Sequence, residues 1–135
     1  MTRLLAYMLF DGECESAMNF YQKLFAGRIE ALATVGESPM AAQFPPAGAR
    51  RVIHASLSFD GNTLMASDWM APEPYPGIKG TRFTLTYESV TEANRVFAEL
   101  SEAGRVQMPM QKTSWARAFG MLVDRFGVPW QVMAQ

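Results

Sequence analysis

The chain has 135 residues, a formal net charge of −1 and 49% hydrophobic residues, which excludes an intrinsically disordered chain. The near-neutral charge offers no basic footprint for nucleic acid, and the single cysteine, Cys14, excludes an internal disulfide. No apolar run approaches the roughly 20 residues that a membrane-spanning helix needs. We therefore expect a soluble cytoplasmic protein with neither a nucleic-acid nor a membrane partner.

The first half of the chain predicts a strand, a helix and three further strands. The helix follows from apolar residues at helical spacing between Glu13 and Gly27, and we expect Gly27 to end it in a left-handed conformation. The dipeptide Asp60-Gly61 predicts a tight hairpin turn. Residues 36–49 and 71–80 are rich in proline and glycine and predict loops. The expected strands cover residues 3–10, 28–35, 51–59 and 63–69.

The second half predicts the same order of elements. Ser89 and Glu92 have the spacing of a capping box, which starts a helix that we expect Gly104 to end. A short strand should stop before Pro109, because proline cannot donate to a sheet ladder. Asp124 and Gly127 predict the turn of the last hairpin. The expected strands cover residues 81–87, 105–108, 115–123 and 128–133.

The repeated order constrains the fold. Each half, about 3–69 and 81–133, offers a small sheet with one helix, which leaves the other face of the sheet uncovered. We therefore predict an α+β fold over residues 1–135, a single domain made of two βαβββ modules. Together they would form an eight-stranded, cup-like mixed sheet with the helices on the outside.

Three stretches resemble the vicinal oxygen chelate superfamily, which contains the glyoxalase, bleomycin-resistance and extradiol dioxygenase proteins. They read FDGECESAMNFYQKLFAG, IHASLSFDGNTLMASD and TSWARAFGMLVDRFGVPWQV, starting at residues 10, 53 and 113. Within the superfamily the chain is similar to the PhnB-like branch, often labelled 3-demethylubiquinone methyltransferase-like. The resemblance implies paired βαβββ modules and a homodimer.

The resemblance also implies four strand positions at which metal-dependent relatives carry His or Glu ligands. Here they fall on or near Ala6, Met65, Arg82 and Gln131, none of which is a good ligand for a borderline transition metal. We therefore predict no catalytic metal and no cofactor. No glycine-rich loop follows a strand, so the residues give the methyltransferase label no support.

Three residues have both a structural and a functional interpretation. His54, the only histidine, is either a hydrogen-bonded, half-buried residue or a base or ligand contact in the cavity. Arg82 either forms a salt bridge, with Asp68 or Glu88, or clamps a carboxylate or phosphate. For Asp124 we favour a structural role in its turn over a catalytic one.

The first functional hypothesis is a non-metal protein that binds a small organic molecule in an apolar cup. The expected apolar walls are Met8, Met65, Trp115, Phe119 and Met133, and the expected polar contacts are His54, Ser67, Arg82 and Gln131. The alternative is a metal-dependent lyase or dioxygenase-like enzyme with unconventional ligands. A third hypothesis is a module for protein association. The residues leave open whether any reaction is catalysed.

Overall fold

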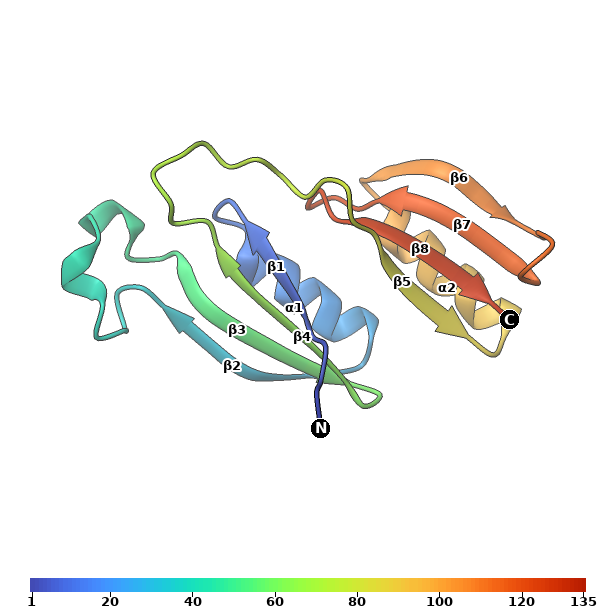
Figure 1. Ribbon diagram of the computed structural model, residues 1–135, viewed down its shortest axis with the longest axis horizontal. Coiled ribbons are helices and arrows are strands. Elements are labelled where there is room, and N and C mark those ends of the chain that lie inside the picture. Colours follow the sequence, from blue (N-terminus) through green and yellow to red (C-terminus); the bar gives the residue numbers. More distant parts are fainter. The chain divides into compact units, whose positions relative to one another are not determined.

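The computed structural model describes all 135 residues as two compact units, residues 1–75 and 76–135 (Figure 1). Each unit contains one helix and four strands, in the order strand, helix and three strands. Unit 1 comprises β1 (Ala6–Phe10), α1 (Cys14–Leu24), β2 (Arg28–Thr34), β3 (Val52–Phe59) and β4 (Asn62–Asp68). Unit 2 comprises β5 (Phe83–Tyr87), α2 (Val90–Ser101), β6 (Arg105–Gln111), β7 (Ala118–Val123) and β8 (Pro129–Ala134). The predicted α+β class and the eight strands are confirmed.

Both units share one sheet topology. The strand order is β1-β4-β3-β2 in unit 1 and β5-β8-β7-β6 in unit 2. In each sheet the first strand pairs with the last one in parallel, and the other pairs are antiparallel, so both sheets are mixed. Closure of the two sheets into one cup stays a prediction.

Each helix packs its apolar stripe against one face of its own sheet. In α1 the buried stripe includes Met18 and Tyr21, and in α2 it includes Val96 and Phe97. The expected cap of α2 is present, because the Ser89 hydroxyl accepts a hydrogen bond from the Glu92 N–H at 3.2 Å. The longer of the two helices has 12 residues, and neither has the length and hydrophobicity to cross a bilayer.

Both helices end in the same Ala-Gly-Arg corner. The left-handed residue is Ala26 in unit 1 (φ 51°) and Ala103 in unit 2 (φ 59°), so the expectation that Gly27 and Gly104 adopt this conformation was wrong. The glycines are needed for a different reason. A Cβ on Gly27 would lie 2.5 Å from the carbonyl oxygen of Ser58, and one on Gly104 would collide equally with the backbone of Val123.

The main difference between the predicted and the observed strands is the length of β6. β6 does not stop before Pro109 but continues to Gln111. The proline is tolerated because β6 is an edge strand, and its register with β7 shifts between Met108 and Gln111. Two short 3₁₀ turns, Ala41–Gln43 and Pro46–Gly48, lie within the predicted loop 36–49.

The close approach at Gly27 makes a testable prediction. We expect Gly27→Ala to lower the free energy of unfolding by about 1–3 kcal/mol, because the new methyl group must displace the backbone of β3. Chemical denaturation measures this change. Gly48→Ala is the matched control, since nothing lies within 4 Å of a Cβ there. Equal stability of the two variants would contradict the steric explanation.

Candidate functional site

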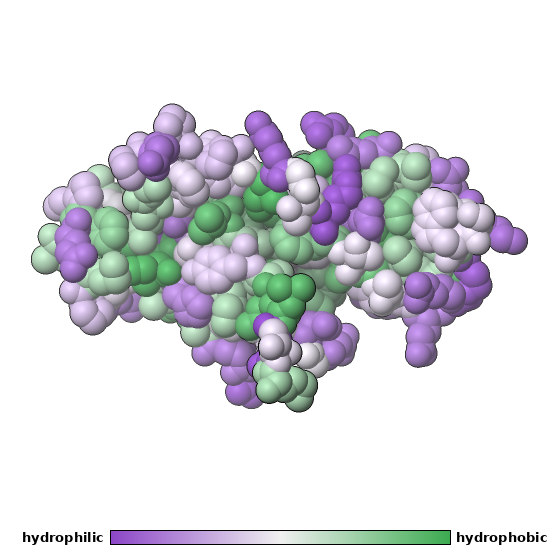
Figure 2. Space-filling view, in the orientation of Figure 1, coloured by the Kyte–Doolittle hydropathy of each residue, from purple (hydrophilic) through white to green (hydrophobic).

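Each sheet has one face that its helix does not cover, and we call it the open face. Strand pairing assigns its residues, because directly paired residues point to the same side of a sheet. Figure 1 shows α1 against one face of the sheet of its own unit and α2 against one face of the sheet of its own unit. The space-filling view from the same side shows hydrophobic patches interspersed with polar ones (Figure 2).

The open face of unit 1 combines aromatic, thioether and hydroxyl groups. Met65 of β4 pairs with Tyr7 of β1 on one side and with Ser56 of β3 on the other. His54 lies two residues before Ser56 and therefore on the same face, and its ring centroid is 6.1 Å from that of Tyr7. Ser67 pairs with Leu9 in the next row of this face. Three of the predicted contacts, His54, Met65 and Ser67, thus share one surface.

Met8 does not belong to this surface. It pairs with Ala66 on the helix-covered face, and its exposed fraction is only 1%. Because the residues of a strand alternate between faces, Met8 packs in the core while its neighbours Tyr7 and Leu9 reach the open face. The expectation that Met8 lines the cavity is therefore a misassignment by one residue.

The open face of unit 2 carries the remaining predicted contacts. The Gln131 side-chain amide donates a hydrogen bond to the Thr84 hydroxyl at 2.8 Å, and Gln131 also pairs with Met121. In the next row Met133 pairs with Phe119. Trp115 precedes β7, is 61% exposed and packs edge-on against the Phe119 ring at 5.3 Å. On this face β7 therefore presents the apolar residues Phe119 and Met121, and β5 and β8 present the hydrogen-bonded side chains of Thr84 and Gln131.

Arg82 lies just before β5, two residues ahead of Thr84. Its Nη1 atom is buried and has no hydrogen-bond partner. Of the two acidic partners that the sequence offered, Asp68 uses both carboxylate oxygens to accept backbone N–H groups within unit 1, and Glu88 of unit 2 is not in an ion pair with Arg82. Within unit 2, Arg82 is thus a partly buried cation without a counter-charge.

The internal repeat relates the strand positions at which the resemblance implies metal ligands in relatives. Superposing the strand pairings of the units equates the Tyr7–Met65 pair with the Thr84–Gln131 pair. By this pairing Tyr7 and Thr84, rather than Ala6 and Arg82, lie directly beside Met65 and Gln131. Phenol, thioether, hydroxyl and amide groups are a poor donor set for zinc or iron, and the chain has no cluster of three His, Cys, Asp or Glu residues suited to a metal. The residues present do not fit a catalytic metal.

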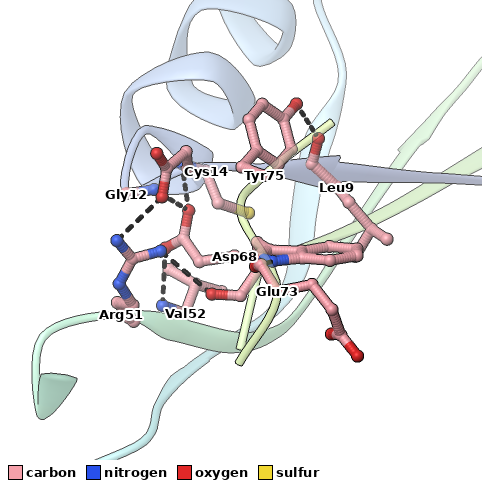
Figure 3. A network of polar contacts seen from close by, with 10 residues as sticks. Leu9, Gly12, Cys14, Arg51, Val52, Asp68, Glu73 and Tyr75 are labelled. Atoms are coloured by element: carbon pink, nitrogen blue, oxygen red, sulfur yellow. Dashed lines mark hydrogen bonds and ion pairs between the residues drawn. The ribbon is translucent and has the colours of Figure 1, made fainter. Parts of the chain in front are cut away.

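Asp68 is one of two buried carboxylates and looks at first like a catalytic group. Its Oδ1 accepts the backbone N–H groups of Gly12 and Cys14 at 2.8 and 3.1 Å, and its Oδ2 accepts that of Val52 at 2.8 Å (Figure 3). Helix α1 has no side-chain cap of its own, so Asp68 supplies one from β4. Asp68 is therefore a structural residue that joins three segments.

Arg51 and Tyr75 extend this polar network around the ends of β1 and β4. The Arg51 guanidinium contacts Asp11 at 2.9 Å and donates to the Trp69 carbonyl, and the Tyr75 hydroxyl donates to the Leu9 carbonyl (Figure 3). Burial raises the pKa of Tyr75. These contacts anchor the segment after β4 to unit 1.

Asp124, the second buried carboxylate, organises the β7–β8 turn. Its Oδ1 accepts the backbone N–H groups of Phe126 and Val128, and its Oδ2 accepts the Trp130 indole N–H at 2.8 Å. Gly127 provides the positive φ of 85° that the turn requires. All of these bonds hold the turn, in agreement with the structural interpretation of Asp124.

Cys14 is an inert thiol rather than a nucleophile. It is fully buried in α1, and burial, with a further contribution from Asp68, raises its pKa from 9.0 to about 12. A cysteine that reacts needs a depressed pKa and access to solvent, and Cys14 has neither.

The arrangement of these groups can be compared with known proteins. A family model described as 3-demethylubiquinone-9 3-methyltransferase matches residues 2–133. The chain belongs to this family. Protein YjdN of Escherichia coli (strain K12) is 32% identical to it, over 96% of this chain and 92% of its own length. The predicted resemblance is confirmed at this level.

Solved structures support the same family. Protein PA1353 of Pseudomonas aeruginosa is 39% identical, covers 100% of this chain and 98% of its own, and has a TM-score of 0.92. The PhnB protein of Bacillus cereus is 26% identical, with coverages of 99% and 100% and a TM-score of 0.81. A glyoxylase/bleomycin resistance protein/dioxygenase domain of Frankia shares only the fold, at 10% identity, coverages of 99% and 97% and a TM-score of 0.66.

The family name describes a methyl transfer, which we do not carry over to this chain. The connection from β1 to α1 has a single glycine, Gly12, and its N–H donates to Asp68, so it is not a glycine-rich loop that could bind a cofactor.

The sequence-based prediction of the site did not include two open-face residues, Tyr7 and Thr84. Aligning the two halves strand by strand would have found both, because they are the partners of Met65 and Gln131.

The role of Asp124 can be tested by Asp124→Asn. The amide cannot accept the N–H groups of the turn and the Trp130 indole together, so we expect unfolding to require about 1–3 kcal/mol less free energy. Thermal denaturation of the purified variant measures the change. Asp60→Asn, in the corresponding turn of unit 1, should be nearly neutral because asparagine tolerates its φ of 47°. Unchanged stability of Asp124→Asn would argue for a functional aspartate.

Proposed function

We propose that this chain binds a small organic molecule on its open faces and that it does so without a catalytic metal. The observation that carries the proposal is the open face of unit 2, where Met121, Met133 and Phe119 lie beside the hydrogen-bonded pair Gln131–Thr84. Ligand sites are typically apolar with a few fixed polar groups, and methionine adapts readily to an irregular ligand.

The open face of unit 1 supports the same proposal with a different set of polar groups. His54, Ser56 and Ser67 supply a ring and two hydroxyls beside Tyr7 and Met65. A neutral imidazole can both donate and accept a hydrogen bond. A ligand with a carbonyl or hydroxyl group suits this surface.

Three further parts of the proposal rest on the family resemblance. The two open faces together would form the cup, two copies of the chain would form a homodimer, and the protein would be cytoplasmic. The uncovered face of each sheet supports the first, because an apolar surface of this kind gains stability when it is shielded from water.

A neutral dye tests the proposed site. Nile red should bind the full chain saturably, with a rise in fluorescence. The double variant Met121→Gln with Met133→Gln should bind it about tenfold or more weakly, because the near-isosteric amides make the surface polar. Met40→Gln is the control, since Met40 is exposed and lies outside both sheets. Unweakened dye binding in the double variant would overturn the proposal.

Elemental analysis tests the metal-free part separately. Protein purified without an affinity tag should contain far less than one equivalent of any transition metal, because Tyr7, Met65, Thr84 and Gln131 form a weak donor set. Protein expressed in medium supplemented with zinc, iron and manganese is the stringent control. A stoichiometric metal that survives dialysis would favour the metal-dependent lyase or dioxygenase-like alternative.

A further inference from the structure

Arg82 is the charged residue of unit 2 with a buried nitrogen that the protein leaves without a partner, whereas the other unpartnered buried atom of this unit, Ser101 Oγ, is neutral. Its Nη1 atom is buried without a hydrogen-bond partner. A guanidinium cannot lose its charge in a protein, so an unsatisfied buried nitrogen costs free energy that a bound partner would recover. An anionic oxygen is the partner that a guanidinium binds best.

Other arginines of the chain show how completely such groups are usually satisfied. Arg51 contacts the Asp11 carboxylate and the Trp69 carbonyl. Arg117 donates to the carbonyls of Gln135 and Glu88. Arg95 is paired with two glutamates on α2. Against this pattern, Arg82 combines a buried nitrogen with no acceptor.

The position of Arg82 relates it to the open face of unit 2. It precedes Thr84 by two residues, and Thr84 bonds the amide of Gln131. Thr86, two residues further on, pairs with Met133, which in turn pairs with Phe119. From Arg82 to Thr86 the strand spans roughly 13 Å. Along this length the cation of Arg82 is followed by the polar pair Thr84–Gln131 and then by the apolar residues beside Thr86.

We infer that Arg82 is the anion-binding residue of this face and that its ligands are small amphipathic oxyanions, with a carboxylate or phosphoryl group at Arg82 and an apolar body toward Met133 and Phe119. This inference rests on the proposed function and specifies the ligand class. The planar fork of the guanidinium suits two oxygens of the same anionic group. Gln131 and Thr84 are placed to contact the middle of such a ligand.

A pair of ligands matched in shape but different in charge tests the inference on the unaltered chain. Calorimetric titration at constant ionic strength would compare benzoate and phenylphosphonate with benzamide, which has nearly the shape of benzoate but no charge. We expect the tighter of the two anions to bind at least tenfold more tightly than benzamide. The preferred anion then distinguishes a carboxylate from a phosphoryl ligand.

Variants assign the preference to Arg82. Arg82→Gln should abolish the advantage of the anion without lowering the melting temperature, because it removes an unpaired buried cation. Arg82→Lys keeps the charge but loses the fork, and it should retain an intermediate preference. Arg105→Gln is the control, since Arg105 is an exposed arginine at the start of β6.

The outcomes separate this inference from the proposed function. Equal binding of benzoate and benzamide, unchanged in Arg82→Gln, would overturn the role of Arg82 and leave the organic-ligand site intact. If no organic probe binds but inorganic phosphate raises the melting temperature of the wild type and not of Arg82→Gln, the anion site stands and the proposed function fails. A sharp loss of stability in both Arg82 variants, with the anion preference retained in Arg82→Gln at the wild-type level, would make Arg82 structural.

Discussion

The structure depends on one constraint, which is that each four-stranded sheet has two faces and only one helix. The helix-covered face is filled by residues such as Leu57 and Leu122, both fully buried, and it satisfies the need for a core. The other face is free to vary, because folding does not require any one side chain there. That freedom is why the two units share a topology and yet present different groups, with a histidine and hydroxyls in one and methionines and an amide in the other.

The fold could be predicted from the sequence because it follows from local signals that occur twice. Apolar spacing located both helices, and the capping serine and the turn at Asp60-Gly61 marked boundaries that the structure keeps. The site was harder, since strand residues alternate and a shift of one position moves a side chain to the opposite face. Met8 was misassigned for this reason. The steric role of Gly27 depends on contact with Ser58 of β3, which is distant in the sequence and leaves no local signal.

The two buried aspartates illustrate how structural demands can imitate catalytic ones. A carboxylate shielded from solvent is a usual sign of an active site. Asp68 and Asp124, however, each accept three N–H groups, and five of these six donors are backbone groups at turns or at the starts of elements, the sixth being the Trp130 indole. Arg82 is the opposite case, because its buried Nη1 has no acceptor for a hydrogen bond. Our proposal for Arg82 therefore rests on a hydrogen-bonding group without a partner and not on burial alone.

The parallel pairing of the first and last strands of each unit also has a consequence for folding. Ala6 pairs with Leu64, and Phe83 pairs with Trp130, so both ladders close long loops, whereas the hairpin of β3 and β4 closes through two residues. Hairpins between neighbouring strands form early. Pairing two strands that are distant in the sequence costs more loop-closure entropy before any contacts form. During synthesis β1 therefore leaves the ribosome first but finds its partner last. Until β4 is complete, the exposed edge of β1 is the part of unit 1 most open to mispairing.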